Sequence, residues 1–113
     1  MHEASLVQAL LERIEQEARA HGAISVAKVR VALGEASGVE RELFEIAYAT
    51  FRERTICADA ELVVVPVRVR WECPGCGRPP TAHGALRCPV CDRPARLAAG
   101  DELILERIEM EVA

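Results

Sequence analysis

Two pairs of cysteines are the residues with the clearest chemistry in this chain of 113 residues. They stand in the segments CPGC and CPVC, which together have the spacing C-x2-C-x11-C-x2-C. A tight turn in each pair brings two sulfurs close to one point, and four thiolates at such a point suit tetrahedral Zn²⁺. The spacing therefore predicts a structural zinc site of Cys73, Cys76, Cys88 and Cys91. A closed set of four thiolates leaves no open coordination position, so we expect no catalysis at this metal.

The same four cysteines have other possible uses, namely a rubredoxin-like or iron–sulfur site, a pair of disulfides, or a redox dithiol. A reducing compartment favours metal ligation over disulfides. The fifth cysteine, Cys57, stands apart from the other four. We expect it to be a buried structural thiol, and a redox or accessory ligand role is the alternative.

A second candidate site lies at the start of the chain, where the sequence reads Met1-His2-Glu3. The amine of Met1, the backbone nitrogen of His2 and its imidazole can close fused chelate rings around one ion. The backbone nitrogen of Glu3 would complete four nitrogens in a plane, a geometry that suits Ni²⁺ or Cu²⁺ better than Zn²⁺. The Glu3 carboxylate could be an axial or outer partner, and it equally suits a helix N-terminus. From these residues alone, an incidental histidine remains the simpler interpretation.

The rest of the chain has no pattern typical of an enzyme. It contains no recognisable nucleophile–base pair, no pair of acid–base carboxylates and no phosphate-binding loop. The segment LGEASG has two glycines without the spacing of a nucleotide loop. We therefore predict no catalysis and no GTP binding by this chain itself.

Two segments have the hydrophobic period of a helix. The first covers residues 6–19, and Gly22 is placed to end it. Ser37 and Glu40 have the spacing of a capping box before the second. Its buried face is expected to contain Leu43, Ala47 and Phe51, flanked by Phe44, Ile46 and Tyr48.

Three segments alternate with period two, as half-buried strands do: residues 23–34, 61–72 and 101–112. Their apolar sides are expected to contain Ala27, Val29, Val31 and Leu33, then Val63, Val65, Val67, Val69 and Trp71, then Ile104, Ile108, Met110 and Val112. Glu106 alone breaks the apolar side of the last segment. Pro66 favours an edge position or a bulge, because it lacks an N–H group.

The order of elements predicts an α/β (α+β) fold in which two helices cover one face of a three-stranded sheet. A zinc-ribbon-like lobe that carries the four paired cysteines is inserted before the last strand, and the two strands that flank it can pair as its stem. The expected division is a domain of residues 1–71 plus 98–113 and a zinc-binding domain of residues 72–97. The inserted segment holds five of the six prolines and few apolar residues, so it cannot form a core of its own.

Composition excludes several classes of protein. The net charge of −4 argues against general nucleic-acid binding, and the inserted segment has no aromatic stacking residue beyond Trp71 at its edge. No apolar run approaches the roughly 20 residues that span a membrane. The first 20 residues are too charged for a secretory signal. We expect a cytoplasmic protein that binds neither membrane nor nucleic acid. Arginines of the insert could offset the anionic sulfurs or simply be solvated.

Taken together, MHEASLVQALLERIE at the start, the helix–strand–helix–strand body and the paired CxxC motifs resemble the HypA/HybF family of [NiFe]-hydrogenase maturation proteins. The resemblance covers essentially the whole chain. It implies that His2 is a nickel ligand, that Glu3 contributes to nickel binding, and that the four cysteines hold structural zinc. Nickel would be a transient cargo. Some members recruit a further histidine near the zinc lobe. His83 lies between the two cysteine pairs, without a clear match to that role.

The resemblance also implies a function and partners. The function is a nickel metallochaperone that helps insert Ni²⁺ into the hydrogenase large subunit precursor, with a HypB-type GTPase as partner. The alternative is a zinc-ribbon adaptor for protein or nucleic acid, without a nickel function. A monomer and a homodimer are equally consistent with the sequence.

Overall fold

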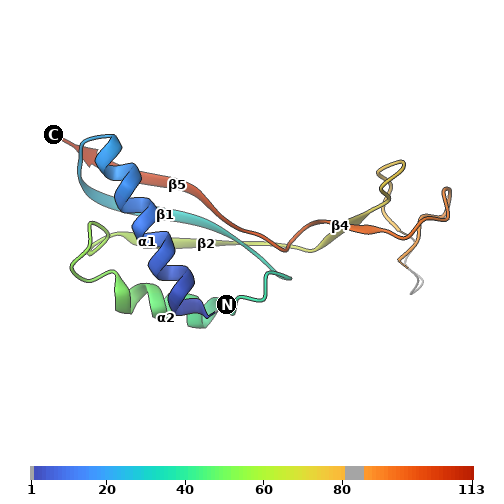
Figure 1. The fold of residues 1–113 in the computed structure, drawn as a ribbon, viewed down its shortest axis with the longest axis horizontal. Coiled ribbons are helices and arrows are strands. Elements are labelled where there is room, and N and C mark those ends of the chain that lie inside the picture. Colours follow the sequence, from blue (N-terminus) through green and yellow to red (C-terminus); the bar gives the residue numbers. More distant parts are fainter. Residues whose placement is uncertain (1, 81–85) are drawn as a thin grey trace.

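The computed structural model describes residues 2–80 and 86–113 (Figure 1). Helix α1 (Glu3–Ala20), strand β1 (Ala23–Gly34), helix α2 (Arg41–Phe51) and strand β2 (Glu61–Val67) follow one another. Strand β3 (Arg70–Glu72), strand β4 (Arg96–Ala99) and strand β5 (Leu103–Val112) complete the described elements. The predicted segments for α1 and β1 are therefore correct, and the second predicted strand is divided into β2 and β3.

The main sheet is mixed, with strand order β2-β1-β5. Strand β1 pairs in parallel with β2 and antiparallel with β5. Pro66 lies in β2 at the edge of the sheet, as its missing N–H predicts. The predicted stem is only partly correct. The last strand joins β1 instead, and the stem of the lobe is the separate two-stranded sheet of β3 and β4.

Both helices share one core with the sheet, as predicted. Its largest fully buried side chains are Phe44, Ile14, Val7, Val29 and Val31. On α2, however, Phe44, Ala47 and Tyr48 are buried, whereas Leu43 and Ile46 are 47% and 62% exposed. The capping box is also absent: α2 begins only at Arg41, and the Ser37 hydroxyl accepts a hydrogen bond from the Val39 N–H. Ser37 thus forms a local turn ahead of the helix.

The faces of the strands differ from a strict alternation for a physical reason. In β5, Leu103, Leu105, Ile108 and Met110 pack against the core, and the register with β1 shifts between Arg107 and Leu105. Glu106 is the extra residue of this bulge, which explains why it interrupts the apolar side. A similar shift in β1 makes Val26, rather than Ala27, the buried residue.

Strand β2 presents the opposite face to the one that we predicted. Leu62 and Val64 pack against the core. Val63 lies instead beside Lys28 and Arg30 in a shallow hollow of the sheet. Strand β2 is apolar on both sides, so alternation alone could not select its buried face.

The lobe is joined to the body where Gly34 and Gly100 meet. The Ala36 N–H donates to the Gly100 carbonyl at 2.6 Å, and the Gly34 N–H donates to the Glu102 carbonyl at 2.8 Å. A Cβ on Gly34 would overlap the Gly100 carbonyl, and one on Gly100 would lie 2.7 Å from the Val69 Cα. Only glycine allows these two backbone segments to approach each other so closely. From this crossing the lobe extends along the longest axis of the molecule, away from the helices (Figure 1).

Candidate metal centres

The two cysteine pairs form two knuckles with the same backbone design. In the first, the Cys73 N–H donates to the Arg78 carbonyl and the Gly77 N–H donates to the Cys73 carbonyl, at 2.8 and 2.9 Å. In the second, the Cys88 N–H donates to the Arg93 carbonyl at 2.9 Å, and the Asp92 N–H donates to the Cys88 carbonyl at 3.0 Å. The residue after the second cysteine has a positive φ in both, 76° at Gly77 and 51° at Asp92. Each turn therefore points its two sulfurs to the same side.

The four sulfurs predicted from the spacing do meet. All of them lie within 4.8 Å of one another, and the Sγ atoms of Cys76 and Cys88 are 3.6 Å apart. A tetrahedron with metal–sulfur bonds of about 2.3 Å has edges of about 3.8 Å, so the cluster has the size that a zinc ion needs. The sulfurs are too far apart for disulfides, which need about 2.05 Å. Cys73 and Cys88 are buried, and Cys76 and Cys91 are exposed.

Backbone N–H groups lower the pKa of the buried thiol in each knuckle. The N–H groups of Cys91 and Val90, both 3.4 Å from the Cys88 sulfur, lower the pKa of Cys88 to about 6. The N–H groups of the second cysteine and of Gly75 lower the pKa of Cys73 in the same way. These donors stabilise a thiolate, the form that binds metal.

The exposed thiol of the second knuckle changes in the opposite direction. A hydrogen bond with Cys76 raises the pKa of Cys91 to about 12. Sulfurs gathered so closely cannot all become anions without a cation between them, because like charges repel. Binding of a divalent metal would therefore displace protons from this cluster.

Two arginines of residues 72–97, and Arg70 just before them, pair with carboxylates. Arg96 and Arg70 contact Glu72 at 3.0 and 3.5 Å, and Arg87 contacts Asp92 at 3.1 Å. Of the two uses considered for these arginines, the contacts favour ordinary surface ion pairs, while backbone N–H groups stabilise the sulfurs. Exposed pairs of this kind add little to stability.

The N-terminal candidates lie at the beginning of α1. His2 is the N-cap residue, is exposed, and makes no capping bond with its side chain. The Leu6 N–H donates to the His2 carbonyl at 3.2 Å, and Glu3 is the acidic residue of the first turn. The carboxylate therefore also has a favourable place near the positive end of the helix dipole. Met1 lies outside the described residues.

His21 and Cys57 join neither centre in the described part of the chain. His21 caps the far end of α1, where its ring nitrogen is 2.8 Å from the Glu17 carbonyl oxygen. Cys57 is fully buried in the core, as a structural thiol would be. Its burial raises its pKa to about 11. His83 lies outside the described residues, so its predicted relation to the zinc lobe has no structural account.

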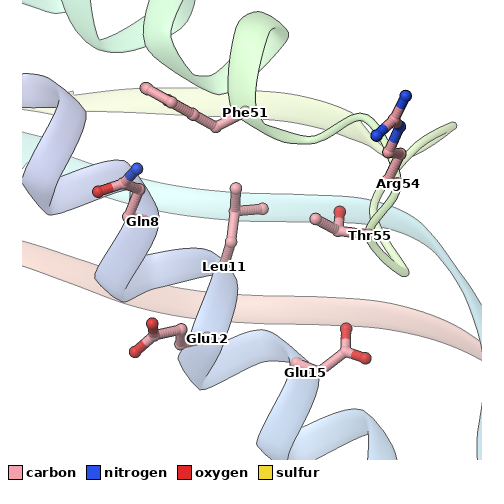
Figure 2. A pocket seen from close by; sticks show the side chains of 7 residues that line it. All are labelled: Gln8, Leu11, Glu12, Glu15, Phe51, Arg54 and Thr55. Atoms are coloured by element: carbon pink, nitrogen blue, oxygen red, sulfur yellow. The ribbon is translucent and has the colours of Figure 1, made fainter.

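A hollow between the helices was not foreseen from the sequence (Figure 2). Leu11 and Phe51 supply its apolar part, and Glu12, Glu15 and Arg54 also line it. Its volume is about 480 Å³. Among the described residues, none of the predicted metal ligands lines this hollow.

The fold and the cluster together define a class: a small α+β protein with a four-cysteine metal lobe on a two-stranded stem. The chain belongs to the HypA family, described as "Hydrogenase/urease nickel incorporation, metallochaperone, hypA", whose model matches residues 1–110. Members of this family are nickel metallochaperones for hydrogenase maturation and are not enzymes, and this agrees with the function predicted from the resemblance. Membership also decides against an adaptor without a nickel function.

Individual relatives support this assignment over the full length. The chain is 42% identical to "Hydrogenase maturation factor HypA" of Wolinella succinogenes, with 98% of this chain and 96% of the relative aligned. It is 39% identical to the protein of the same name from Aquifex aeolicus, with 99% of both aligned. The solution structure of the Ni metallochaperone HypA from Helicobacter pylori matches with a TM-score of 0.78 at 33% identity and covers 100% of both chains.

One further observation concerns membranes. Within the described part of the chain, neither α1 nor α2 has both the length and the apolar character needed to cross a bilayer.

Proposed function

We propose that this chain carries Ni²⁺ at its N-terminus and delivers it during hydrogenase maturation. The ligands would be the amine of Met1, the backbone nitrogen and imidazole of His2, and the backbone nitrogen of Glu3, with the Glu3 carboxylate as an axial or outer partner. The observation that carries the proposal is the position of His2 as an exposed N-cap whose imidazole takes no part in capping.

The start of α1 suits this chemistry. The first backbone bond of the helix runs from the Leu6 N–H to the His2 carbonyl. The amides of His2 and Glu3 precede that ladder, because the first N–H groups of a helix have no partner within it. Their deprotonation by a metal would therefore break no helical bond. An exposed terminus also lets a partner reach the ion and exchange its ligands.

The cysteine cluster has a separate role in this proposal. Zn²⁺ would be held by Cys73, Cys76, Cys88 and Cys91, where it would cross-link two turns that have no hydrophobic core between them. We assign residues 72–97 to this zinc-binding domain and residues 1–71 plus 98–113 to the nickel-binding domain. The closed thiolate set supports a structural role, whereas the cargo needs an open one.

The proposal extends to partners and setting. The nickel would pass between this chain, a HypB-type GTPase and the hydrogenase large subunit precursor. Family membership supports these partners. A separate GTPase would be needed for any GTP-dependent step, because this sequence has no nucleotide-binding loop. The cytoplasm is the proposed location, because a reducing compartment keeps five cysteines available as thiols.

Nickel titration of the untagged, zinc-loaded chain tests the proposal. We expect about one Ni²⁺ per chain beyond the zinc, and loss of that nickel in His2→Ala with zinc content unchanged. The matched control is His21→Ala, because His21 is an exposed histidine at the opposite end of the same helix. Isothermal titration calorimetry gives the stoichiometry, and elemental analysis gives the zinc content.

The amine provides an independent check on the same site. Acetylating the N-terminus, or placing a tag before Met1, should weaken nickel binding because it removes one of the four nitrogens. Binding should also fall steeply with acid, since each of these ligands must lose or lack a proton. Full nickel uptake by the acetylated chain and by His2→Ala would contradict the proposal.

A further inference from the structure

The two knuckles share a backbone design but differ at the third residue of each CPxC segment. This residue is Gly75 in the first knuckle and Val90 in the second. In both knuckles its N–H lies beside the sulfur of the buried cysteine, at 3.3 Å from Cys73 and 3.4 Å from Cys88. A side chain at this position therefore borders the sulfur cluster, and glycine leaves that place open in the first knuckle.

The side chain of Arg93 lies at the open place. A Cβ on Gly75 would be 3.6 Å from both the Cδ and the Nη1 atoms of Arg93, and 3.7 Å from the Cys73 sulfur. The guanidinium and this sulfur are therefore closer to each other than the Debye length, about 8 Å at physiological ionic strength. The Arg93 carbonyl accepts the Cys88 N–H of the second knuckle at 2.9 Å. One residue thus contacts both knuckles, with its backbone in the second and its side chain against the first.

The positive charge of Arg93 is available to the sulfurs. Both carboxylates of residues 72–97, Glu72 and Asp92, contact other arginines. In the described part of the chain, this leaves the Arg93 guanidinium without a carboxylate partner. Arginine keeps its charge at any pH at which the protein is folded. Four thiolates around one Zn²⁺ carry a net charge of about −2, and a cation nearby stabilises such thiolates.

We propose that Arg93 is a positioning residue of the metal centre, which joins the two knuckles and lowers the reactivity of the Cys73 thiolate through its charge. The proposal rests on the zinc site proposed above. Residues just outside a metal's ligands tune those ligands in this way. A thiolate that is stabilised by a cation is a weaker nucleophile toward alkylating and oxidising agents.

The first knuckle supplies a matched control for Arg93. Arg78 has the same place in its own knuckle, because its carbonyl accepts the Cys73 N–H at 2.8 Å. Both arginine side chains are exposed. On the second knuckle, however, the place that corresponds to Gly75 is filled by the side chain of Val90. The contact between an arginine and the opposite knuckle is therefore expected of Arg93 and not of Arg78.

Alkylation of the untagged, zinc-loaded chain tests the proposal. Iodoacetamide is a neutral reagent, so the charge of Arg93 neither attracts nor repels it, and peptide mass spectrometry follows the modification of Cys73. Arg93→Gln should raise the rate of this modification by about threefold to tenfold, because the thiolate loses a nearby cation. Arg93→Lys keeps the charge, so it and the control Arg78→Gln should each change the rate by less than about twofold.

Salt dependence separates the charge of Arg93 from its packing. Added salt screens the charge, so it should raise the alkylation rate of the wild-type chain and of Arg93→Lys, and leave Arg93→Gln nearly unchanged. The wild-type measurement remains decisive even if Arg93→Gln fails to retain zinc. Equal rates in Arg93→Gln and Arg78→Gln, or a wild-type rate that does not respond to salt, would overturn the inference.

Elemental analysis before alkylation keeps this inference separate from the proposed zinc site. A wild-type chain that binds no zinc would contradict the zinc site itself. Zinc at about one ion per chain, together with rates that do not depend on Arg93, would contradict only the role of Arg93.

Discussion

Single side chains differ in how far their surroundings prepare them for chemistry. Cys73 and Cys88 receive backbone N–H donors before any metal arrives, because the knuckle turns point those donors at the sulfur. His2 has no such preparation, since its imidazole is exposed at the N-cap. A resident ion benefits from preformed ligands, while a cargo site must also release its ion. The two centres therefore match the two roles that we assign to them.

Two buried acidic groups outside the metal centres predict how stability depends on pH. Burial raises the pKa of Cys57 from 9.0 to about 11 and that of Tyr48 from 10.0 to about 12. Both groups are neutral in the folded core and ionise more easily in the unfolded chain. The unfolded state therefore loses protons first as pH rises, and the free energy of unfolding should fall from about pH 9 to about pH 12.

Urea unfolding followed by circular dichroism can measure this fall. The rise of each pKa corresponds to a loss of about 3 kcal/mol once the pH exceeds the pKa of the folded state. Tyr48→Phe removes the tyrosine contribution, so its stability curve should be flatter above pH 10. At neutral pH the same variant should lose about 1 kcal/mol, because the Tyr48 hydroxyl donates to the Ala60 carbonyl at 2.9 Å. Parallel curves above pH 10 would contradict the assignment.

At the scale of elements, the sequence predicted those features that depend on short stretches of chain. Helix α1 and strand β1 follow from hydrophobic period and from Gly22, which has a φ of 67° at the end of α1. The cluster of four cysteines could be predicted from their spacing, because two CxxC turns whose sulfurs meet at one point have few uses other than metal binding. Fixed ligand spacing and strong amphipathic period are both encoded over short stretches of chain.

Features set by pairing between distant strands could not be predicted in the same way. The bulge at Glu106 shows in the sequence only as one charge on an apolar side, and its meaning depends on the register with β1. The buried face of β2 depends on which side the helices cover. The short β4 has no pattern of its own, since it exists by pairing with β3. Likewise, the start of α2 is set by the turn at Ser37.

The crossing of Gly34 and Gly100 yields a prediction about the joint between lobe and body. Gly100→Ala combines a φ of 103° with a contact to the Val69 Cα, and should cost about 3 kcal/mol of unfolding free energy. Gly34→Ala overlaps backbone without a positive φ and should cost a similar amount, about 3 kcal/mol.

The control for both substitutions is Gly38→Ala. Gly38 has a φ of 79° but open space around its Cβ position, so it isolates the conformational cost, about 1 kcal/mol. Chemical denaturation of the three variants gives the comparison. Equal losses of unfolding free energy in all three variants would mean that the close approach of the two backbone segments does not add to the cost of the substitutions at Gly34 and Gly100.

At the scale of the whole molecule, charge and packing divide unequally between body and lobe. Segment 68–96 contains six of the fourteen basic residues but only two of the eighteen acidic ones. The hydrophobic core cluster lies entirely in the helices, the main sheet and the loops between them. In the described part of segment 72–97, the buried side chains are those of Cys73 and Cys88. The body is therefore held by apolar burial and the lobe by its sulfurs.

This division predicts that removing the metal unfolds one part of the chain and spares the other. A strong chelator should abolish amide-exchange protection in the lobe, because loss of the ion leaves two turns and a short β3–β4 stem. A metal bound by four thiolates supplies about 10 kcal/mol or more of folding free energy in isolated zinc modules. The β1 amides should stay protected, since the core that covers them contains none of the four cysteines.

Trp71 provides a second readout of the same event. It is the single tryptophan of the chain, it lies in β3 next to the first knuckle, and it is half-buried. Its fluorescence should shift to longer wavelength when zinc is removed and return when zinc is added. The helical circular dichroism should change little, since α1 and α2 belong to the body. A lobe that keeps its exchange protection without metal, or helices that melt together with it, would show that the sulfur cluster does not hold the lobe independently of the body.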